Sequence, residues 1–150
     1  MDETKRDDLR DQAWKYFSLH ADQRLKTFNF YLILCTIIAG GMLTLIKDAR
    51  DPRIAIPVAL LLPSLSLVFW KLDTRNRQLI DHSQNALMFF EDDPTLKGPD
   101  GTPHVTQIFL FEKHFTDLNR PWTYRRCFNA VFLIVGLVGC FTAIALACIR

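Results

Sequence analysis

The chain has 150 residues, of which 49% are apolar and 23% are charged, and its formal net charge is only +2. This length accommodates one domain, and the nearly balanced charge excludes the strong basic excess of a nucleic-acid-binding domain. The order of the residues shows more than these averages, because every charged residue lies outside three apolar windows, 28–46, 54–70 and 128–149. The sequence therefore predicts an all-α membrane protein with three transmembrane helices. A buried hairpin of a soluble domain is the alternative.

Residues 4–27 contain no Gly or Pro and continue directly into the first apolar window. Trp14, Phe17, Ala21 and Leu25 recur at a spacing of three or four residues, which indicates an amphipathic helix. We therefore predict a cytoplasmic helix over 1–27 that runs on as the transmembrane helix 28–46. A cleaved signal peptide is disfavoured, because a long and charge-rich segment precedes the window and no A-x-A site follows it.

The second window, 54–70, follows a short outer loop at 47–53, so the first two spans are expected to form a long antiparallel hairpin. This window is marginal in length. Pro57 falls in its first turn, where the missing N–H costs little, whereas Pro63 is predicted to kink the helix.

Beyond the second span, a set of apolar and uncharged polar residues continues to alternate by four and three, as in a coiled-coil seam. They are Leu72, Asn76, Leu79, Ser83, Ala86 and Phe90. Asp73 and Arg77 are expected as an i,i+4 pair on the outside of this helix. The pattern predicts that the hairpin carries a cytoplasmic coiled-coil-like extension, with polar residues on its seam.

The central region 71–127 is predicted to hold cytoplasmic helices and a loop. The stretch 91–105 is rich in Pro, Gly and acids, including Glu91, and is typical of an exposed loop with solvated carboxylates. Next, Ile108, Phe111, Phe115 and Leu118 share one helical face, which either lies on the membrane surface or covers the extension. The segment 119–121 should then break the chain before the third span, 128–149.

The orientation follows from the basic residues, because cytoplasmic flanks carry an excess of Lys and Arg. An N-terminus inside the cell places 14 of the 18 basic residues in cytoplasmic segments. We therefore predict a multi-pass protein with a cytoplasmic N-terminus and an external C-terminus. The locally basic outer loop points weakly the other way.

No arrangement of residues predicts an enzyme. The four histidines share no metal-ligand spacing, the four cysteines form no CxxC pair, and the catalytic and phosphate-binding glycine motifs are missing from the sequence. The spans also contain no charge that would mark a transport path. We expect no cofactor and no metal site.

The third span offers a surface for helix association. Gly139, Ala143 and Ala147 form a stripe of small residues every four positions, which lets helices approach closely. The stripe fits packing within one chain and homo-oligomerisation equally well. Asn29 and Asn129, near the starts of the first and third spans, could form a hydrogen bond across such a contact.

Two strings are distinctive: RLKTFNFYL at 24–32 and LDTRNRQLIDHSQNALMFFE at 72–91. Together with the N-terminal helix and short outer loop, they resemble small transmembrane effectors of bacterial antiphage defence loci, of the retron-associated two-transmembrane type. The resemblance implies an inner-membrane toxin that a reverse transcriptase–RNA/DNA complex holds silent until infection, and whose release causes abortive infection. Those effectors have two spans, whereas three are predicted here.

The candidate partner contacts flank the first two spans. They are Arg24, Lys26, Asn29, Asp73, Arg75, Asn76 and Arg77. Any one of them can instead serve as an anchor at the membrane surface or as a helix-surface pair. Two other functions stay open: a non-toxic membrane anchor or adaptor that recruits a cytoplasmic protein, and a subunit of a membrane enzyme or transporter.

Overall fold

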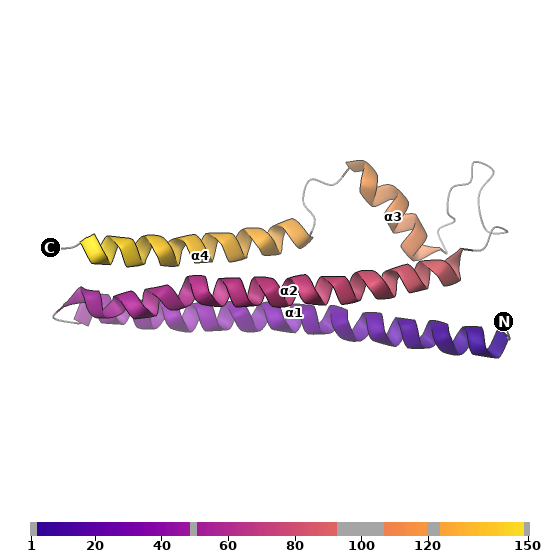
Figure 1. Ribbon diagram of the computed structural model, residues 1–150, viewed down its shortest axis with the longest axis horizontal. Helices are drawn as coiled ribbons and strands as arrows, with labels where there is room; N and C mark the ends of the chain where they lie inside the picture. Colours follow the sequence, from indigo (N-terminus) through magenta and orange to yellow (C-terminus); the bar gives the residue numbers. More distant parts are fainter. Residues whose placement is uncertain (1–2, 49–50, 93–106, 120–123, 149–150) are drawn as a thin grey trace. The chain divides into compact units, whose positions relative to one another are not determined.

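A computed structural model describes residues 3–48, 51–92, 107–119 and 124–148. Over these residues the protein is 97% helical and contains no strand, which confirms the predicted all-α class. The elements are α1 (Glu3–Asp48), the short 3-10 helix η1 (Pro52–Ala55), α2 (Ile56–Glu91), α3 (Ile108–Asn119) and α4 (Tyr124–Cys148), shown in Figure 1. Most of the predicted loop 91–105 and of the predicted break at 119–121 lies outside the described residues.

Helices α1 and α2 lie side by side and run antiparallel, as predicted (Figure 1). The ion pair between Arg24 and Asp73 and the hydrogen bond between Tyr31 and Ser66 show the register, because position rises along α1 while it falls along α2. Helix α1 continues to Asp48, two residues into the segment predicted as the outer loop.

The turn into α2 is capped locally. The Asp51 side chain accepts a hydrogen bond from the backbone N–H of Arg53 at 2.9 Å, and Pro52 supplies a fixed φ at the start of η1. Helix α2 then continues through Pro63 to Glu91 as one α-helix.

The chain divides into two compact units. The span unit comprises Arg24–Thr74 and Tyr124–Arg150, and the extension unit comprises Met1–Gln23 and Arg75–Thr123. Helices α1 and α2 contribute residues to both units.

The core of the span unit lies where α1, α2 and α4 meet. Its inner cluster contains Tyr31, Cys35, Leu62, Phe69, Phe128 and Phe132. A second cluster contains Met42, Ala55, Ala59, Ala143 and Leu146. The small residues in the second cluster shorten the distance at which helices can pack.

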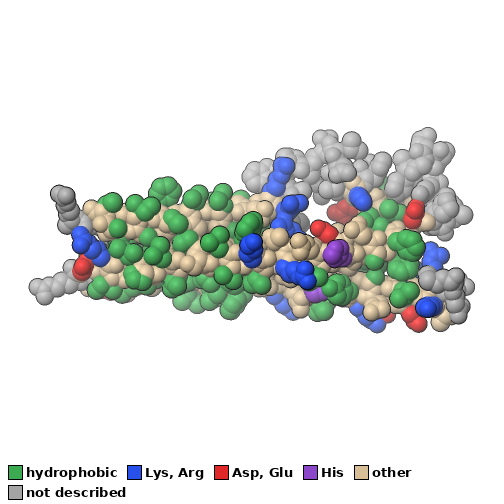
Figure 2. Space-filling view, viewed as in Figure 1, with side chains coloured by type: hydrophobic (Ala, Val, Ile, Leu, Met, Phe, Trp, Pro, Cys, Tyr) green, Lys and Arg blue, Asp and Glu red, His purple; other side chains and the backbone are tan. Residues whose placement is uncertain are grey.

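Among the described residues, three helices are long and apolar enough to cross a membrane, and only 17%, 28% and 22% of their most apolar windows are buried within the protein. Figure 2 shows the consequence: hydrophobic side chains cover much of the visible surface of the span unit, and Lys and Arg side chains lie at both ends of this apolar surface. An apolar surface of this extent is typical of contact with lipid or with other membrane helices.

Candidate functional site

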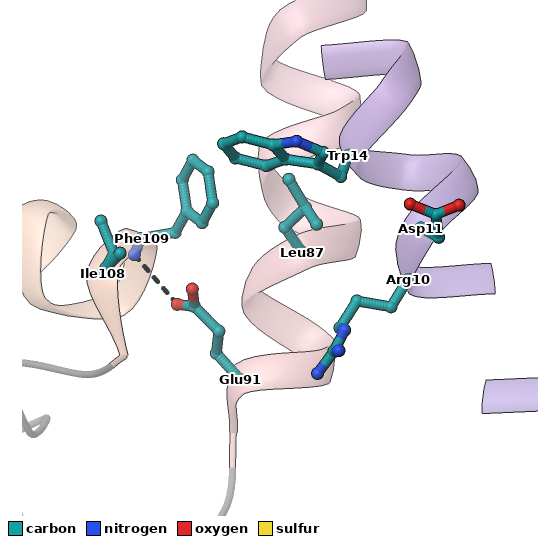
Figure 3. A pocket seen from close by; sticks show the side chains of 7 residues that line it. All are labelled: Arg10, Asp11, Trp14, Leu87, Glu91, Ile108 and Phe109. Atoms are coloured by element: carbon teal, nitrogen blue, oxygen red, sulfur yellow. Dashed lines mark hydrogen bonds between the residues drawn. The ribbon is translucent and has the colours of Figure 1, made fainter. Parts of the chain in front are cut away.

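The candidate site in the extension unit is a pocket at which three helices meet (Figure 3). Helix α1 contributes Arg10, Asp11 and Trp14, and the cavity volume is about 310 Å³. The Trp14 side chain is 51% exposed, which is unusual for an indole that has apolar neighbours. An exposed aromatic ring beside an arginine is a common composition for a protein-binding surface.

The aromatic wall of this pocket joins α3 to α1. Phe109 meets Trp14 and Phe17 edge-on, with ring centroids 6.2 and 5.3 Å apart. Helix α3 thus contacts α1 within the extension unit. The contact is made by Phe109, whereas Ile108, which was expected on the covering face, is 63% exposed.

Glu91, which lines the pocket, and Gln107 form hydrogen bonds that cap the start of α3. The Glu91 carboxylate accepts hydrogen bonds from the backbone N–H groups of Phe109 (2.9 Å) and Leu110 (3.2 Å), and the first of these is drawn in Figure 3. The Gln107 amide in turn donates to the Glu91 carbonyl oxygen at 2.6 Å. The expectation that Glu91 is a solvated loop carboxylate is therefore wrong. Its carboxylate accepts hydrogen bonds from backbone N–H groups in the first turn of α3, which have no partner within that helix.

In the span unit, the predicted residues Arg24 and Asp73 form one contact. The Arg24 guanidinium donates from Nε to Asp73 Oδ1 at 2.6 Å and from Nη2 to Oδ2 at 3.3 Å. Its central carbon lies 4.8 Å from the centroid of the Phe128 ring. Only 16% of the Arg24 side chain and 5% of the Asp73 side chain are exposed. One arginine thus ties together α1, α2 and α4.

The predicted position of Asp73 on the outside of α2 is wrong, because Arg24 of α1 covers it. Its neighbour Leu72, expected on the seam, is instead 47% exposed. On α1, Trp14 and Leu25 likewise lie outside the seam, at 51% and 53% exposure. The other predicted seam residues of α2 are half-buried or, at Ser83, buried, so the prediction fails at single positions and not along the whole face.

The remaining predicted contacts do not form one cluster. Lys26, Asn29 and Arg75 are exposed, whereas Asn76 and Arg77 are half-buried. Asn29 and Asn129 form no hydrogen bond with each other within the described chain.

The small stripe of α4 packs partly inside the protein. A Cβ at Gly139 would lie 2.6 Å from Pro63 Cδ and 2.9 Å from the Ala59 carbonyl oxygen, so α4 touches α2 there. Ala143 is buried, while Ala147 is exposed.

Two contacts of the span unit had no place in the sequence-based prediction. The rings of Phe28 and Phe128 stack with centroids 3.9 Å apart and planes 2° from parallel. The hydroxyls of Tyr31 and Ser66 lie 2.8 Å apart, and Ser66 also donates to the Leu62 carbonyl. The hydrogen bond could have been anticipated from the two hydroxyl groups inside apolar windows, since buried hydroxyls require partners.

The described residues contain no group of three or more His, Cys, Asp or Glu side chains that could hold a metal ion. The four cysteines are free thiols, and only Cys35 is buried.

One comparison with known proteins is informative. The chain is 30% identical over 140 residues to CD-NTase-associated protein 19 of Escherichia coli, and the match covers 89% of this chain and 87% of that protein. No family model and no solved structure matches. The aligned length extends over both units, so the similarity concerns the whole architecture.

Proposed function

Because the chain belongs to the family of CD-NTase-associated protein 19, we propose that it is a membrane-embedded effector of a bacterial antiphage defence system. The observation that carries this proposal is the match along nearly the whole of both chains. The three membrane-capable helices support it, since an effector of this kind acts on the bilayer itself. The proposed location is the inner membrane, with a cytoplasmic N-terminus.

The proposed action is not enzymatic. The described part of the chain offers exposed apolar helix faces and a pocket of mixed chemistry, which suit association rather than bond cleavage. On release from its controller, the protein perturbs the membrane and causes abortive infection. The apolar windows, buried for less than a third of their residues, provide the surface for that association.

The controller we propose is a CD-NTase system, because the E. coli relative is named for its association with a CD-NTase. A reverse transcriptase–RNA/DNA complex, which the retron resemblance implies, is the second candidate. The two differ in the gene beside this one and in the protein that copurifies with the full-length chain.

The pocket of Figure 3 is the proposed docking point of the cytoplasmic partner protein. It combines exposed apolar groups, Trp14 and Ile108, with the Arg10 guanidinium, and it is built from all three helices of the extension unit. A partner bound there contacts α1, α2 and α3 at once.

The first experiment is induced expression of the chain without its neighbouring genes, read with a potential-sensitive dye. The expected result is rapid depolarisation and growth arrest. Unchanged potential and unchanged growth would reject the effector and favour the membrane anchor or adaptor, which predicts harmless overexpression.

A second experiment separates the docking point from the toxic action. Ile108→Arg is expected to abolish silencing by the coexpressed controller while the depolarisation itself persists. Leu19→Arg is the matched control, since Leu19 is a similarly exposed apolar residue of the extension unit that does not line the pocket. Equal behaviour of the two variants would contradict the docking point.

A further inference from the structure

A groove of about 530 Å³ opens on the span unit between α2 and α4. Leu67 and Leu133 line it and are 64% and 63% exposed. Ser66 and Gly136 line it with little side-chain bulk. Small residues in the lining of an apolar groove allow another helix to approach closely.

One polar group in this groove lacks a partner. The Asn129 side chain lines the groove, and its Oδ1 is buried without a hydrogen bond to any described residue. The protein itself covers Oδ1, so a neighbour in the groove reaches the outward half of the carboxamide. A half-turn about the Cβ–Cγ bond exchanges the oxygen and the amide nitrogen, so this outward half can offer either a donor or an acceptor. A lipid chain supplies neither, and an unsatisfied amide in an apolar setting is costly.

Within the span unit, the contacts between α1 and α4 show which residues of the two helices lie at the same depth in the membrane. Phe28 stacks on Phe128, and Tyr31 meets Phe132 with ring centroids 4.8 Å apart. Met42 shares a cluster with Ala143. Because both helices run in the same direction with the same rise, residues whose numbers differ by about 100 lie at the same depth. Asn29 therefore lies at the depth of Asn129.

The face of α1 that carries Asn29 points away from the core. Asn29, Ile33, Thr36 and Gly40 are separated by three or four residues and are all exposed. A Cβ at Gly40 would meet nothing within 4 Å, and Thr36 directs its hydroxyl back to the Leu32 carbonyl. The face is thus apolar and narrow at Gly40, with one free carboxamide at its cytoplasm-proximal end.

We propose that α1 of a second copy of this chain docks in the α2–α4 groove, where its Asn29 forms a hydrogen bond with Asn129. The two carboxamides lie at equal depth, so copies standing side by side in one bilayer bring them together without a vertical shift. The donor face and the groove are different surfaces, which makes the contact heterologous. Repeated, it produces a ring or an open array rather than a closed dimer. The inference needs the membrane location but not the defence role.

Disulfide cross-linking of the full-length chain in lipid vesicles tests the contact. Ile33 and Leu133 lie at the same depth on the two proposed surfaces, so Ile33→Cys and Leu133→Cys are combined after the four natural cysteines are replaced by alanine. The expected product is a ladder of dimers, trimers and larger species. The matched control replaces Leu133→Cys by Ile134→Cys, since Ile134 is 59% exposed but does not line the groove.

Equal cross-linking in the two double variants, or a product that stops at the dimer, would overturn the proposal. Absence of any cross-link would do the same and would mean that lipid alone fills the groove. If the chain depolarises the membrane but forms no ladder, the interface is rejected and the proposed function stands. If it forms the ladder without depolarising the membrane, the proposed function is rejected and the interface stands.

The hydrogen bond has its own test. Asn29→Leu and Asn129→Leu are each expected to reduce the cross-linked fraction roughly threefold, the usual size of an interhelical hydrogen bond in a membrane. The double variant should be no weaker than either single variant, because both changes remove the same bond. Independent, multiplying losses would show that the two residues do not pair.

Discussion

Arg24 makes contacts with two other helices of the span unit. Its guanidinium bonds to Asp73 with two hydrogen bonds and lies against the Phe128 ring. Arginine suits this place because its planar group binds a carboxylate with two donors and an aromatic face at once. The pair is mostly shielded from water, so each partner depends on the other.

At this residue scale, Asp73→Ala is expected to lower the free energy of unfolding by about 3 kcal/mol, because it leaves a mostly buried guanidinium without its counter-ion. Thermal unfolding of the purified protein in detergent measures the loss. Asp81→Ala is the matched control, an exposed acid of the same helix, and should change stability by less than about 0.5 kcal/mol. Equal losses in both variants would contradict the role of the pair.

The sequence identified Arg24 and Asp73 as notable residues but placed Asp73 on the wrong side of α2. Helical spacing alone predicts a face and cannot tell which of two adjacent positions, Leu72 or Asp73, turns inward. The choice depends on a residue of α1 that is 49 positions away, which no local pattern contains.

At the scale of elements, α4 packs closely against α2 at Gly139. A Cβ there would meet Pro63 at 2.6 Å and Leu62 at 2.8 Å. Gly139→Ala is therefore expected to destabilise the protein by about 1–3 kcal/mol, since the helices must move apart. At Gly136 the nearest atom is 3.5 Å away, so Gly136→Ala serves as the control and should be nearly neutral.

The unfolding temperatures of these two variants, measured in detergent, test this prediction. If both alanines are tolerated alike, the close contact at Gly139 does not contribute to packing.

Helix α3 is held by the reciprocal cap at Glu91. Glu91→Ala is expected to destabilise the start of α3 by about 1 kcal/mol, because it removes the acceptor of two backbone N–H groups. Amide hydrogen exchange should quicken at Phe109 and Leu110. Glu112→Ala, an exposed acid within α3, is the control, and unchanged exchange in Glu91→Ala would refute the cap.

The elements themselves were largely predictable. The uncharged windows predicted three spans, and the short connection predicted the antiparallel hairpin, because these features follow from length and hydropathy. The cap between Glu91 and Gln107 could not be predicted, since the two residues lie 16 positions apart and no local sequence pattern links them. The pocket beside this cap was not predicted for the same reason, although Trp14 was recognised as part of an apolar face.

At the scale of the whole molecule, the distribution of basic residues still predicts a cytoplasmic N-terminus and an external C-terminus. A fluorescent protein fused to the N-terminus should fluoresce, and alkaline phosphatase fused to the C-terminus should be active. The reverse pair of fusions is the control and should give neither signal. Activity in the reverse pair would show that the basic loop at 47–53 controls orientation instead.

The contact of Arg24 with Asp73 and Phe128 also has a consequence for biosynthesis. Arg24 and Asp73 leave the ribosome before Phe128 does, so the hairpin of α1 and α2 can neutralise its own charges before the third span exists. The later arrival then brings only an aromatic cover and apolar surface. During synthesis the two buried charges can therefore form their ion pair first, and α4 then packs against a hairpin whose charges are already neutralised.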